Sequence, residues 1–255
     1  MHPGEHEIMA RVEQYHWWYR GLRDAVAKSL AQKDLALPAR PRILDAGCGT
    51  GENLRFLGDR LRPDYLGGFD RSEEAVRFAR AKAPAADVYT GDLCDPEIRV
   101  DDLDLIVSLD VIYIPGVERS LGGLRRLAGA LRSGGLMVLN LPAYDWLFSE
   151  HDVAIHTSER YTSPKVRSLL ETLGLSVERL SYRLCFLFPA VVLGRLPSLL
   201  RARPGDAAAR SDLHAVPGKT TNRILFSVLR IENELVARGT RLPWGSSVFA
   251  IGRKA

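Results

Sequence analysis

Apolar residues along this chain follow two alternating periods. Between residues 5 and 30 they recur at every third or fourth position, through Val12, Trp18 and Val26, which predicts an N-terminal helical segment. Helical patterns also cover residues 72–83 and 120–131 and begin again at Pro164. Short apolar runs predict strands over residues 42–47, 65–70, 87–91, 103–110, 134–143, 175–182 and 246–254. This alternation predicts an α/β fold with a seven-stranded, mostly parallel sheet and helices on both faces.

The order of these elements divides the chain into four segments of one predicted domain, residues 1–255. They are an N-terminal helical cap (1–37), a core (38–182), an insertion (183–242) and a last strand (243–255). The insertion contains an amphipathic helix, which we expect to pack through its apolar stripe and to be capped by Thr221 or Asn222. The stripe consists of Ile224, Leu225, Val228, Ile231 and Leu235.

The most apolar segment, residues 184–200, is short for a bilayer span and contains Pro189, Arg195 and Pro197. We therefore expect no stable membrane insertion. Core packing is favoured over a weak membrane contact, while a ligand pocket and a dimer surface stay open as alternatives. A monomer and a homodimer are both compatible with the sequence.

Charge and cysteine usage narrow the class of protein further. The formal net charge is +4, and the basic residues are scattered among acids, so no nucleic-acid partner is expected. Cys48, Cys94 and Cys185 fit neither a disulfide framework nor a zinc pattern. The N-terminus carries acids where a signal peptide has basic residues. These features predict a cytoplasmic protein with reduced thiols and no metal.

A glycine-rich turn follows the first predicted strand, in the sequence Ile43-Leu-Asp-Ala-Gly-Cys-Gly-Thr-Gly51. Glycine is needed where the backbone takes positive φ or where a ligand approaches too closely for a Cβ. Gly47, Gly49 and Gly51 are spaced by two residues, whereas a dinucleotide fingerprint places its third glycine three residues after the second. Asp45 would attract a cationic amino group and repel a pyrophosphate. The turn therefore predicts a site for an amino-acid-like nucleotide cofactor.

Further motifs follow the turn in a fixed order. Asp70 and Arg71 end the second apolar run, Asp92 and Leu93 follow a glycine, and the fourth run ends in Leu109 and Asp110. Together these motifs resemble the class I S-adenosylmethionine (SAM)-dependent methyltransferase superfamily from residue 42 to about residue 142. The resemblance implies a Rossmann-like fold, SAM as cofactor and S-adenosylhomocysteine (SAH) as product.

The resemblance also implies a role for each motif. Asp70, with Arg71 beside it, would hold the ribose, because two carboxylate oxygens suit two vicinal hydroxyls. Asp92 would accept from the adenine amine while Leu93 packs against the ring. The methionine part of the cofactor would lie near the end of the fourth strand. The expected cofactor site thus comprises Asp45, Gly47, Cys48, Gly49, Gly51, Asp70, Arg71, Asp92, Leu93, Leu109 and Asp110.

The segment from Tyr15 to Arg20 places four aromatic rings and a histidine within six residues. Similar helices precede the glycine motif in some bacterial small-molecule methyltransferases, where they cover cofactor and acceptor. Aromatic faces attract a desolvated sulfonium, which makes Trp17 and Trp18 candidate cofactor contacts. For Trp18, simple packing of the helix is an equally good interpretation.

Residues 144–163 follow the fifth strand without a clear period and are predicted to form a loop or lid at the ligand-binding edge of the sheet. His151 is the first candidate general base and His156 the second. A base is optional, because in-line methyl transfer gains much of its rate from alignment. The spacing of these histidines matches no named zinc motif. The predicted acceptor contacts are Tyr113, Trp146, Arg160 and Tyr161.

These inferences favour a SAM-dependent methyltransferase acting on a small molecule of natural-product or glycan type. One alternative is an enzyme that keeps the SAM pocket but catalyses a non-methylating reaction, such as cyclisation or decarboxylation. An RNA methyltransferase would need an added RNA-binding module or a basic face, neither of which the sequence shows. A non-catalytic partner and an NAD-binding protein are the remaining alternatives.

Overall fold

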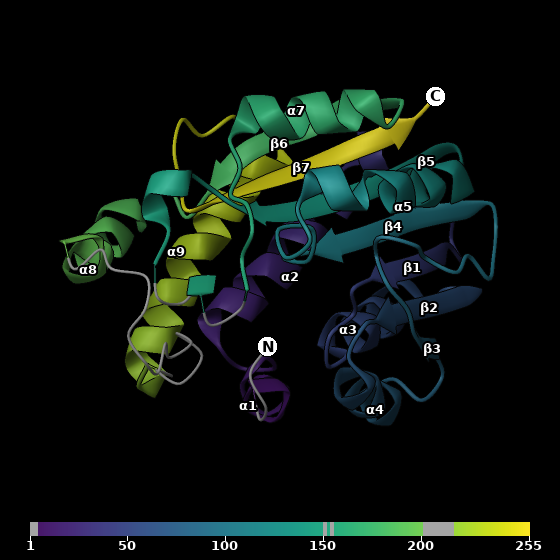
Figure 1. Ribbon diagram of the computed structural model, residues 1–255, viewed down its shortest axis with the longest axis horizontal. Helices are drawn as coiled ribbons and strands as arrows, with labels where there is room; N and C mark the ends of the chain where they lie inside the picture. The colour runs from purple at the N-terminus through teal and green to yellow at the C-terminus, as the bar shows by residue number, and fades with distance from the viewer. Residues whose placement is uncertain (1–4, 150–151, 154–155, 201–216) are drawn as a thin grey trace.

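The computed structural model describes residues 5–149, 152–153, 156–200 and 217–255, with side chains described outside residues 195–200 (Figure 1). Its centre is one seven-stranded sheet with the strand order β3-β2-β1-β4-β5-β7-β6. Only β7 runs antiparallel to its neighbours, which confirms the predicted mostly parallel sheet. The strands are β1 (Arg42–Ala46), β2 (Tyr65–Asp70), β3 (Asp87–Thr90), β4 (Leu103–Leu109), β5 (Leu131–Pro142), β6 (Leu175–Arg183) and β7 (Ser247–Lys254).

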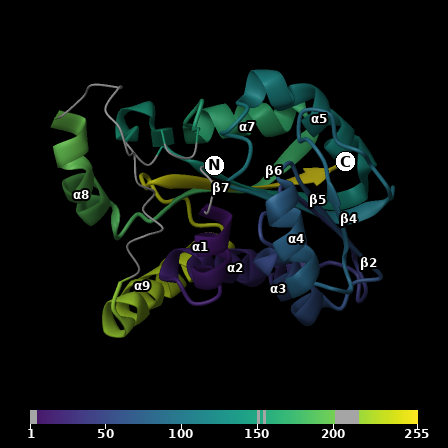
Figure 2. The ribbon, with the colours of Figure 1, turned by 60° about the horizontal axis from the view of Figure 1, so that its bottom comes forward.

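Helices cover both faces of this sheet, as Figure 2 shows. One buried cluster joins the sheet to Leu124 and Leu127 of one helix and Val166 of another. A second cluster, on the other face, includes Leu57 and Val236. The helices are α1 (Glu5–Val12), α2 (Trp17–Leu30), η1 (Lys33–Leu35), α3 (Glu52–Leu61), α4 (Glu73–Lys82), α5 (Val117–Ala130), η2 (Asp145–Leu147), α7 (Ser163–Thr172), α8 (Phe188–Leu200) and α9 (Lys219–Ala237).

The N-terminal helical segment is broken after Val12, although its apolar period runs on without a gap. His16 takes an extended conformation, and its ring accepts a hydrogen bond from the backbone N–H of Trp18, so it acts as the N-cap of α2. Arg23 donates to the carbonyls of Glu13 at 2.6 Å and Gln14 at 3.4 Å. These two contacts stabilise the break, because they satisfy carbonyls that a continuous helix would have bonded internally.

The helix predicted in the insertion is α9, but it packs through a different face from the one expected. Ile224 and Ile231 of the apolar stripe are 58% and 64% exposed, whereas Leu229 and Asn233 are buried against α2. The N-cap is Gly218, not Thr221 or Asn222. Asn222 instead accepts from the backbone of Trp17 and donates to the carbonyl of Tyr15. Hydrogen bonds to the start of α2 therefore orient this helix. The apolar period of the helix alone could not reveal this orientation.

The apolar segment 184–200 begins buried and then leaves the core. Leu184 and Cys185 are buried, but Phe186 is 49% exposed and Leu193, on α8, is 66% exposed. Figure 1 shows α8 at one end of the molecule, away from the sheet. Core packing was therefore the wrong expectation for α8. Within the described residues, no helix is long and apolar enough to cross a membrane.

Two helical glycines give a matched test of the contact between α2 and α9. A Cβ at Gly21 would lie 2.3 Å from Cδ1 of Leu229, which is fully buried, whereas a Cβ at Gly122 in α5 would meet nothing within 4 Å. Gly21→Ala should lower the free energy of unfolding by about 1–3 kcal/mol through overpacking. Gly122→Ala should raise it by about 0.5–1 kcal/mol through helix propensity. Urea denaturation of both variants measures the difference, and equal stabilisation would contradict this packing.

Candidate functional site

The carboxyl ends of the parallel strands bring the predicted motifs together at one edge of the sheet. In the register, Asp45 of β1 lies opposite Gly68 of β2 and Val107 of β4. Leu109 lies opposite Asn140 of β5. The strand order reverses between β1 and β4, which is where open α/β sheets bind their ligands.

Each glycine of the turn has positive φ, as predicted: 87° at Gly47, 53° at Gly49 and 88° at Gly51. A Cβ at Gly51 would lie 2.5 Å from the backbone of Ala79, so this glycine allows α3 and α4 to pack closely. At Gly49 a Cβ would meet only the methyl end of Met9, at 2.8 Å. At Gly49, therefore, the turn leaves room for a ligand beneath the Met9 side chain, which can move.

Asp70 holds the glycine turn against the end of β2. Its Oδ2 accepts from the backbone N–H of Gly49 at 3.0 Å, and its Oδ1 accepts from that of Ser72 at 2.9 Å. The carboxylate therefore lies beside the turn at the position where the resemblance places the ribose. A carboxylate oxygen can accept a second hydrogen bond, so these contacts leave capacity for hydroxyl donors.

Asp45 is the most unusual group of the site. Its side chain is fully buried, and neither carboxylate oxygen has a hydrogen-bond partner. Burial raises the pKa of Asp45 to about 8, with further increases from the nearby Asp70 and Glu13. A desolvated carboxylate without a partner is costly, and a cationic group would remove that cost. These orphaned oxygens fit the ammonium group of an amino-acid-like cofactor.

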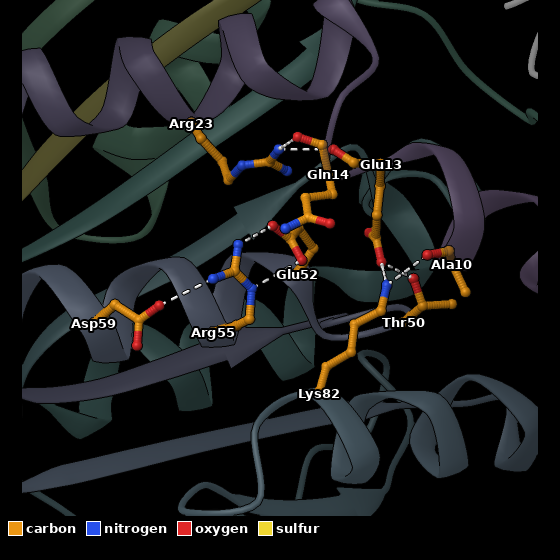
Figure 3. Close-up of polar contacts among 9 residues, drawn as sticks. All are labelled: Ala10, Glu13, Gln14, Arg23, Thr50, Glu52, Arg55, Asp59 and Lys82. Atoms are coloured by element: carbon orange, nitrogen blue, oxygen red, sulfur yellow. Dashed lines mark hydrogen bonds and ion pairs between the residues drawn. The ribbon is translucent and has the colours of Figure 1, made fainter.

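The helix α1 is tied over the glycine turn through Glu13, which the sequence reading did not single out (Figure 3). This buried carboxylate accepts from the hydroxyl of Thr50 in the turn and from Nζ of Lys82 at the end of α4. Lys82 also donates to the carbonyl of Ala10 at 2.9 Å. Burial raises the pKa of Glu13 despite these donors. Nothing in the periodic pattern of the sequence marks Glu13, three residues before His16, for such a role.

Other predicted cofactor contacts have local partners in the structure. Asp92 is exposed and accepts from the backbone of Cys94, while Arg71 is exposed on the surface. Leu93, Leu109 and Cys48 are buried, and the Cys48 side chain packs in the core with Leu54. Cys48 can therefore offer a ligand only its backbone.

The two tryptophans of α2 lie edge to face, with ring centroids 6.2 Å apart. The guanidinium of Arg183 lies 6.0 Å from the centroid of the Trp18 ring. Both rings are partly exposed. The contact with Arg183 supports packing as the role of Trp18.

The predicted acceptor contacts separate into buried and exposed groups. Tyr161 is fully buried in the core and donates to Glu159, which corrects the expectation that it lines the acceptor site. Arg160 is buried in an ion pair with Asp152 at 2.6 Å. Trp146 is half-exposed and stacks on Tyr144, with centroids 5.7 Å apart.

The remaining candidates are Tyr113 and the two lid histidines. Tyr113 is buried beside Asp110, and that burial raises its pKa well above the usual range. His156 is exposed, with a φ of 60°. His151 lies outside the described residues.

A chain of buried polar groups links the site to the insertion. Asn140 donates to Asp110 at 2.8 Å and accepts from Nη1 of Arg183 at 3.1 Å. Arg183 in turn contacts Asn233 of α9 at 3.4 Å, and Asn233 donates to the carbonyl of Gly21 at 2.7 Å. The sequence did contain one signal: Asn140 is a polar residue inside an otherwise apolar buried strand, and such a group requires a partner.

The fold and the site together define an α/β domain whose glycine turn and strand-end carboxylates lie at the switch point of its sheet. Residues 43–135 match the family model described as "Methyltransferase domain". This part of the chain is therefore similar to SAM-dependent methyltransferase domains.

Three known proteins show how far the similarity extends. The chain is 33% identical to the biotin biosynthesis bifunctional protein BioCD of Bordetella avium, covering 61% of this chain and 33% of that protein. It is 28% identical to a trans-aconitate 2-methyltransferase of Variovorax paradoxus, covering 49% and 47%. The chain thus spans less than half the length of these relatives. Magnesium protoporphyrin IX methyltransferase of Synechocystis, solved with bound SAH, shares the fold at a TM-score of 0.51 and 22% identity, covering 64% and 76%.

Substitutions in the turn should separate binding from folding. Gly49→Val places a branched side chain at a backbone with a φ of 53°, in the space above the turn, and should abolish SAH binding. Asp70→Ala removes both acceptor oxygens and should weaken SAH binding by about tenfold or more. Isothermal calorimetry measures both affinities, and circular dichroism checks that the variants fold. Unchanged SAH affinity in both variants would contradict the assignment of the site.

The raised pKa of Asp45 predicts two opposite pH effects. In the cofactor-free protein, the raised pKa means that stability falls as pH rises from about 4 through about 8, because burial resists ionisation. An ammonium bound at Asp45 requires the ionised form, so SAH binding at pH 7 should release about one proton and strengthen with pH. Calorimetry in buffers of different ionisation enthalpy measures this proton release. Asp45→Asn should eliminate it, and the same release in that variant would assign the proton elsewhere.

Proposed function

We propose that this protein transfers a methyl group from SAM to a small-molecule acceptor. The observation that carries the proposal is Asp45, a fully buried carboxylate without a partner beside a glycine turn with three positive φ values. A cofactor with a cationic amino-acid end accounts for both features, whereas a pyrophosphate would be repelled by Asp45. The match of residues 43–135 to a methyltransferase domain supports the same cofactor.

The chain's own residues divide the work of binding and alignment. Asp45 would hold the ammonium group, Asp70 would accept from the ribose hydroxyls, and the cradle at Gly49 would admit the cofactor backbone. The helix α1, bound to the turn through Glu13, would exclude water from the reacting groups. When bound, SAM supplies a methyl group on a sulfonium that leaves as a neutral thioether. Alignment by these contacts therefore supplies much of the rate.

The acceptor is proposed to be a small molecule because the names of similar proteins refer to small-molecule chemistry, in trans-aconitate methylation and in biotin biosynthesis. A natural-product or glycan-type acceptor, contacted by Tyr113 and Trp146, fits this picture. Three free cysteines are consistent with a reducing compartment, and we place the reaction in the cytoplasm. The protein would act as a monomer or homodimer without a nucleic-acid partner.

The base role of the lid histidines stays a prediction. His156 lies near the buried pair of Arg160 and Asp152, which would anchor the lid at the edge of the sheet. A lid that closes over the acceptor would bring an exposed histidine toward it. His156→Ala should leave SAH affinity unchanged while slowing turnover, and undiminished turnover would remove His156 from catalysis.

Calorimetric titration of the purified protein with SAH, with NAD as the control ligand, tests the proposed function directly. We expect micromolar affinity for SAH and no measurable heat for NAD, because the turn and Asp45 select against a pyrophosphate. Asp45→Asn serves as the matched control and should weaken SAH binding at least about tenfold. Binding of NAD, or of neither ligand, would overturn the proposal. SAH formed in step with an altered but unmethylated product would instead indicate a non-methylating reaction.

A further inference from the structure

The carboxylate of Asp110 has one oxygen held by a hydrogen-bond donor and the other open. Asp110 ends β4 with a φ of 57°, and its backbone N–H donates to the carbonyl of Asn140 at 2.9 Å. Its Oδ1 accepts from the Asn140 amide at 2.8 Å. No described residue donates to Oδ2, and this oxygen is not among the sealed, unpartnered atoms of the described structure. Asp45, in contrast, has both oxygens sealed from solvent.

The charged groups at this edge of the sheet form two compartments, one around Asp45 on the cofactor side and a second around Asp110. The charged groups that act on Asp45 are Asp70 and Glu13, which belong to the cofactor side. Those that act on Asp110 are Arg183 from β6 and Arg160 from the segment before α7. Asp110 is therefore separated electrostatically from the carboxylates around the glycine turn.

Two tyrosines complete the second compartment. Tyr113 interacts with Asp110, Asp152 and Arg160. Tyr19 of α2 interacts both with Glu13 on the cofactor side and with Asp110 and Tyr113. It therefore lies between the acids of the cofactor side and Asp110.

The protein holds the Asp110 carboxylate in one orientation and partly offsets the cost of ionising it in a buried place. Asn140 is fully buried, as is Arg183, and Asn140 is fixed between Arg183 and Asp110. Burial raises the pKa of Asp110 to about 6, against the lowering effects of the Asn140 hydrogen bond, Arg183 and Arg160. At neutral pH the group is thus mostly ionised yet able to take up a proton.

We propose that Asp110 is the base that receives the acceptor's proton, and that the acceptor is a neutral molecule bearing a hydroxyl or amine rather than a carboxylate. This inference rests on the proposed methyl transfer. The acceptor's oxygen or nitrogen forms a bond to the methyl carbon as the carbon–sulfur bond breaks. The electron pair of that bond leaves with the neutral sulfur of SAH, and the acceptor's proton passes to Oδ2 of Asp110 and then to solvent.

A carboxylate acceptor would suit this compartment poorly. It is already deprotonated and needs no base, and an ionised Asp110 beside it would repel it. In this respect the chain would differ from a trans-aconitate methyltransferase, whose name indicates a carboxylate-rich substrate. Asn140 and Arg183 act as positioning residues, because they reach the acceptor only through Asp110.

The first experiment compares SAH affinity in wild type, Asp110→Asn and Asp70→Ala by calorimetry. Asp110→Asn should bind SAH within about twofold of wild type, whereas Asp70→Ala should bind it more weakly. If Asp110→Asn loses SAH affinity as Asp70→Ala does, Asp110 belongs to the cofactor site and the inference fails. If wild type binds no SAH at all, the proposed function fails instead.

The second experiment follows the Asp110 carboxyl by carbon NMR in aspartate-labelled protein saturated with SAH, using Asp110→Asn to assign the signal. The expected midpoint lies near pH 6 and moves upward in Asn140→Ala, because a donor to the ionised form is lost. A midpoint in the range of an ordinary exposed aspartate, unmoved in Asn140→Ala, would overturn the inference.

The third experiment measures methyl transfer to catechol, aniline and trans-aconitate as representative phenol, neutral amine and carboxylate probes. Transfer to a phenol or amine should fall at least about a hundredfold in Asp110→Asn, and its wild-type rate should rise with pH through about 6. His156→Ala should keep that pH dependence. Transfer to trans-aconitate that Asp110→Asn retains would overturn the inference.

Discussion

The energetic constraint at the centre of this structure is a carboxylate buried without a counter-ion. Asp45 lies in the central strand β1 and beneath the glycine turn, where no described protein group donates a hydrogen bond to it. The backbone around Asp45 leaves the end of the strand accessible to a ligand, because three glycines with positive φ turn the chain there. The fold therefore carries a carboxyl group that stays protonated until a cation binds, and this couples cofactor binding to the stability of the domain.

The sheet and the glycine turn were predictable because their signals are local. Apolar runs of strand length and turn glycines give the order of the strands along the chain, and the turn gives the cofactor class. The packing of α9 was not predictable, because its apolar stripe faces outward while Leu229 and Asn233 face α2. An amphipathic period shows that a helix has two faces, but polar contacts with a distant segment decide which face is covered.

The candidate site shows the same division between local and long-range information. Asp45 and Asp70 could be predicted as cofactor contacts from their place at strand ends. Tyr161 was predicted to contact the acceptor because its neighbours in sequence look like a ligand-binding loop, but its side chain is fully buried in the core. Arg183 and Glu13 were missed, since their importance arises from contacts with residues more than thirty positions away in the chain. Buried charges at such positions are expensive unless the fold supplies partners, so their presence marks where several elements must meet correctly.

The position of α1 has a consequence for the timing of each reaction cycle. Met9 lies above Gly49, and Glu13 ties the segment to Thr50 and to Lys82 (Figure 3). A cofactor that occupies the cradle must enter and leave past this segment, so exchange of spent for fresh cofactor requires local opening of the N-terminus. In the proposed reaction, the rate at which this eight-residue helix opens would set an upper limit on turnover, independent of the chemical step.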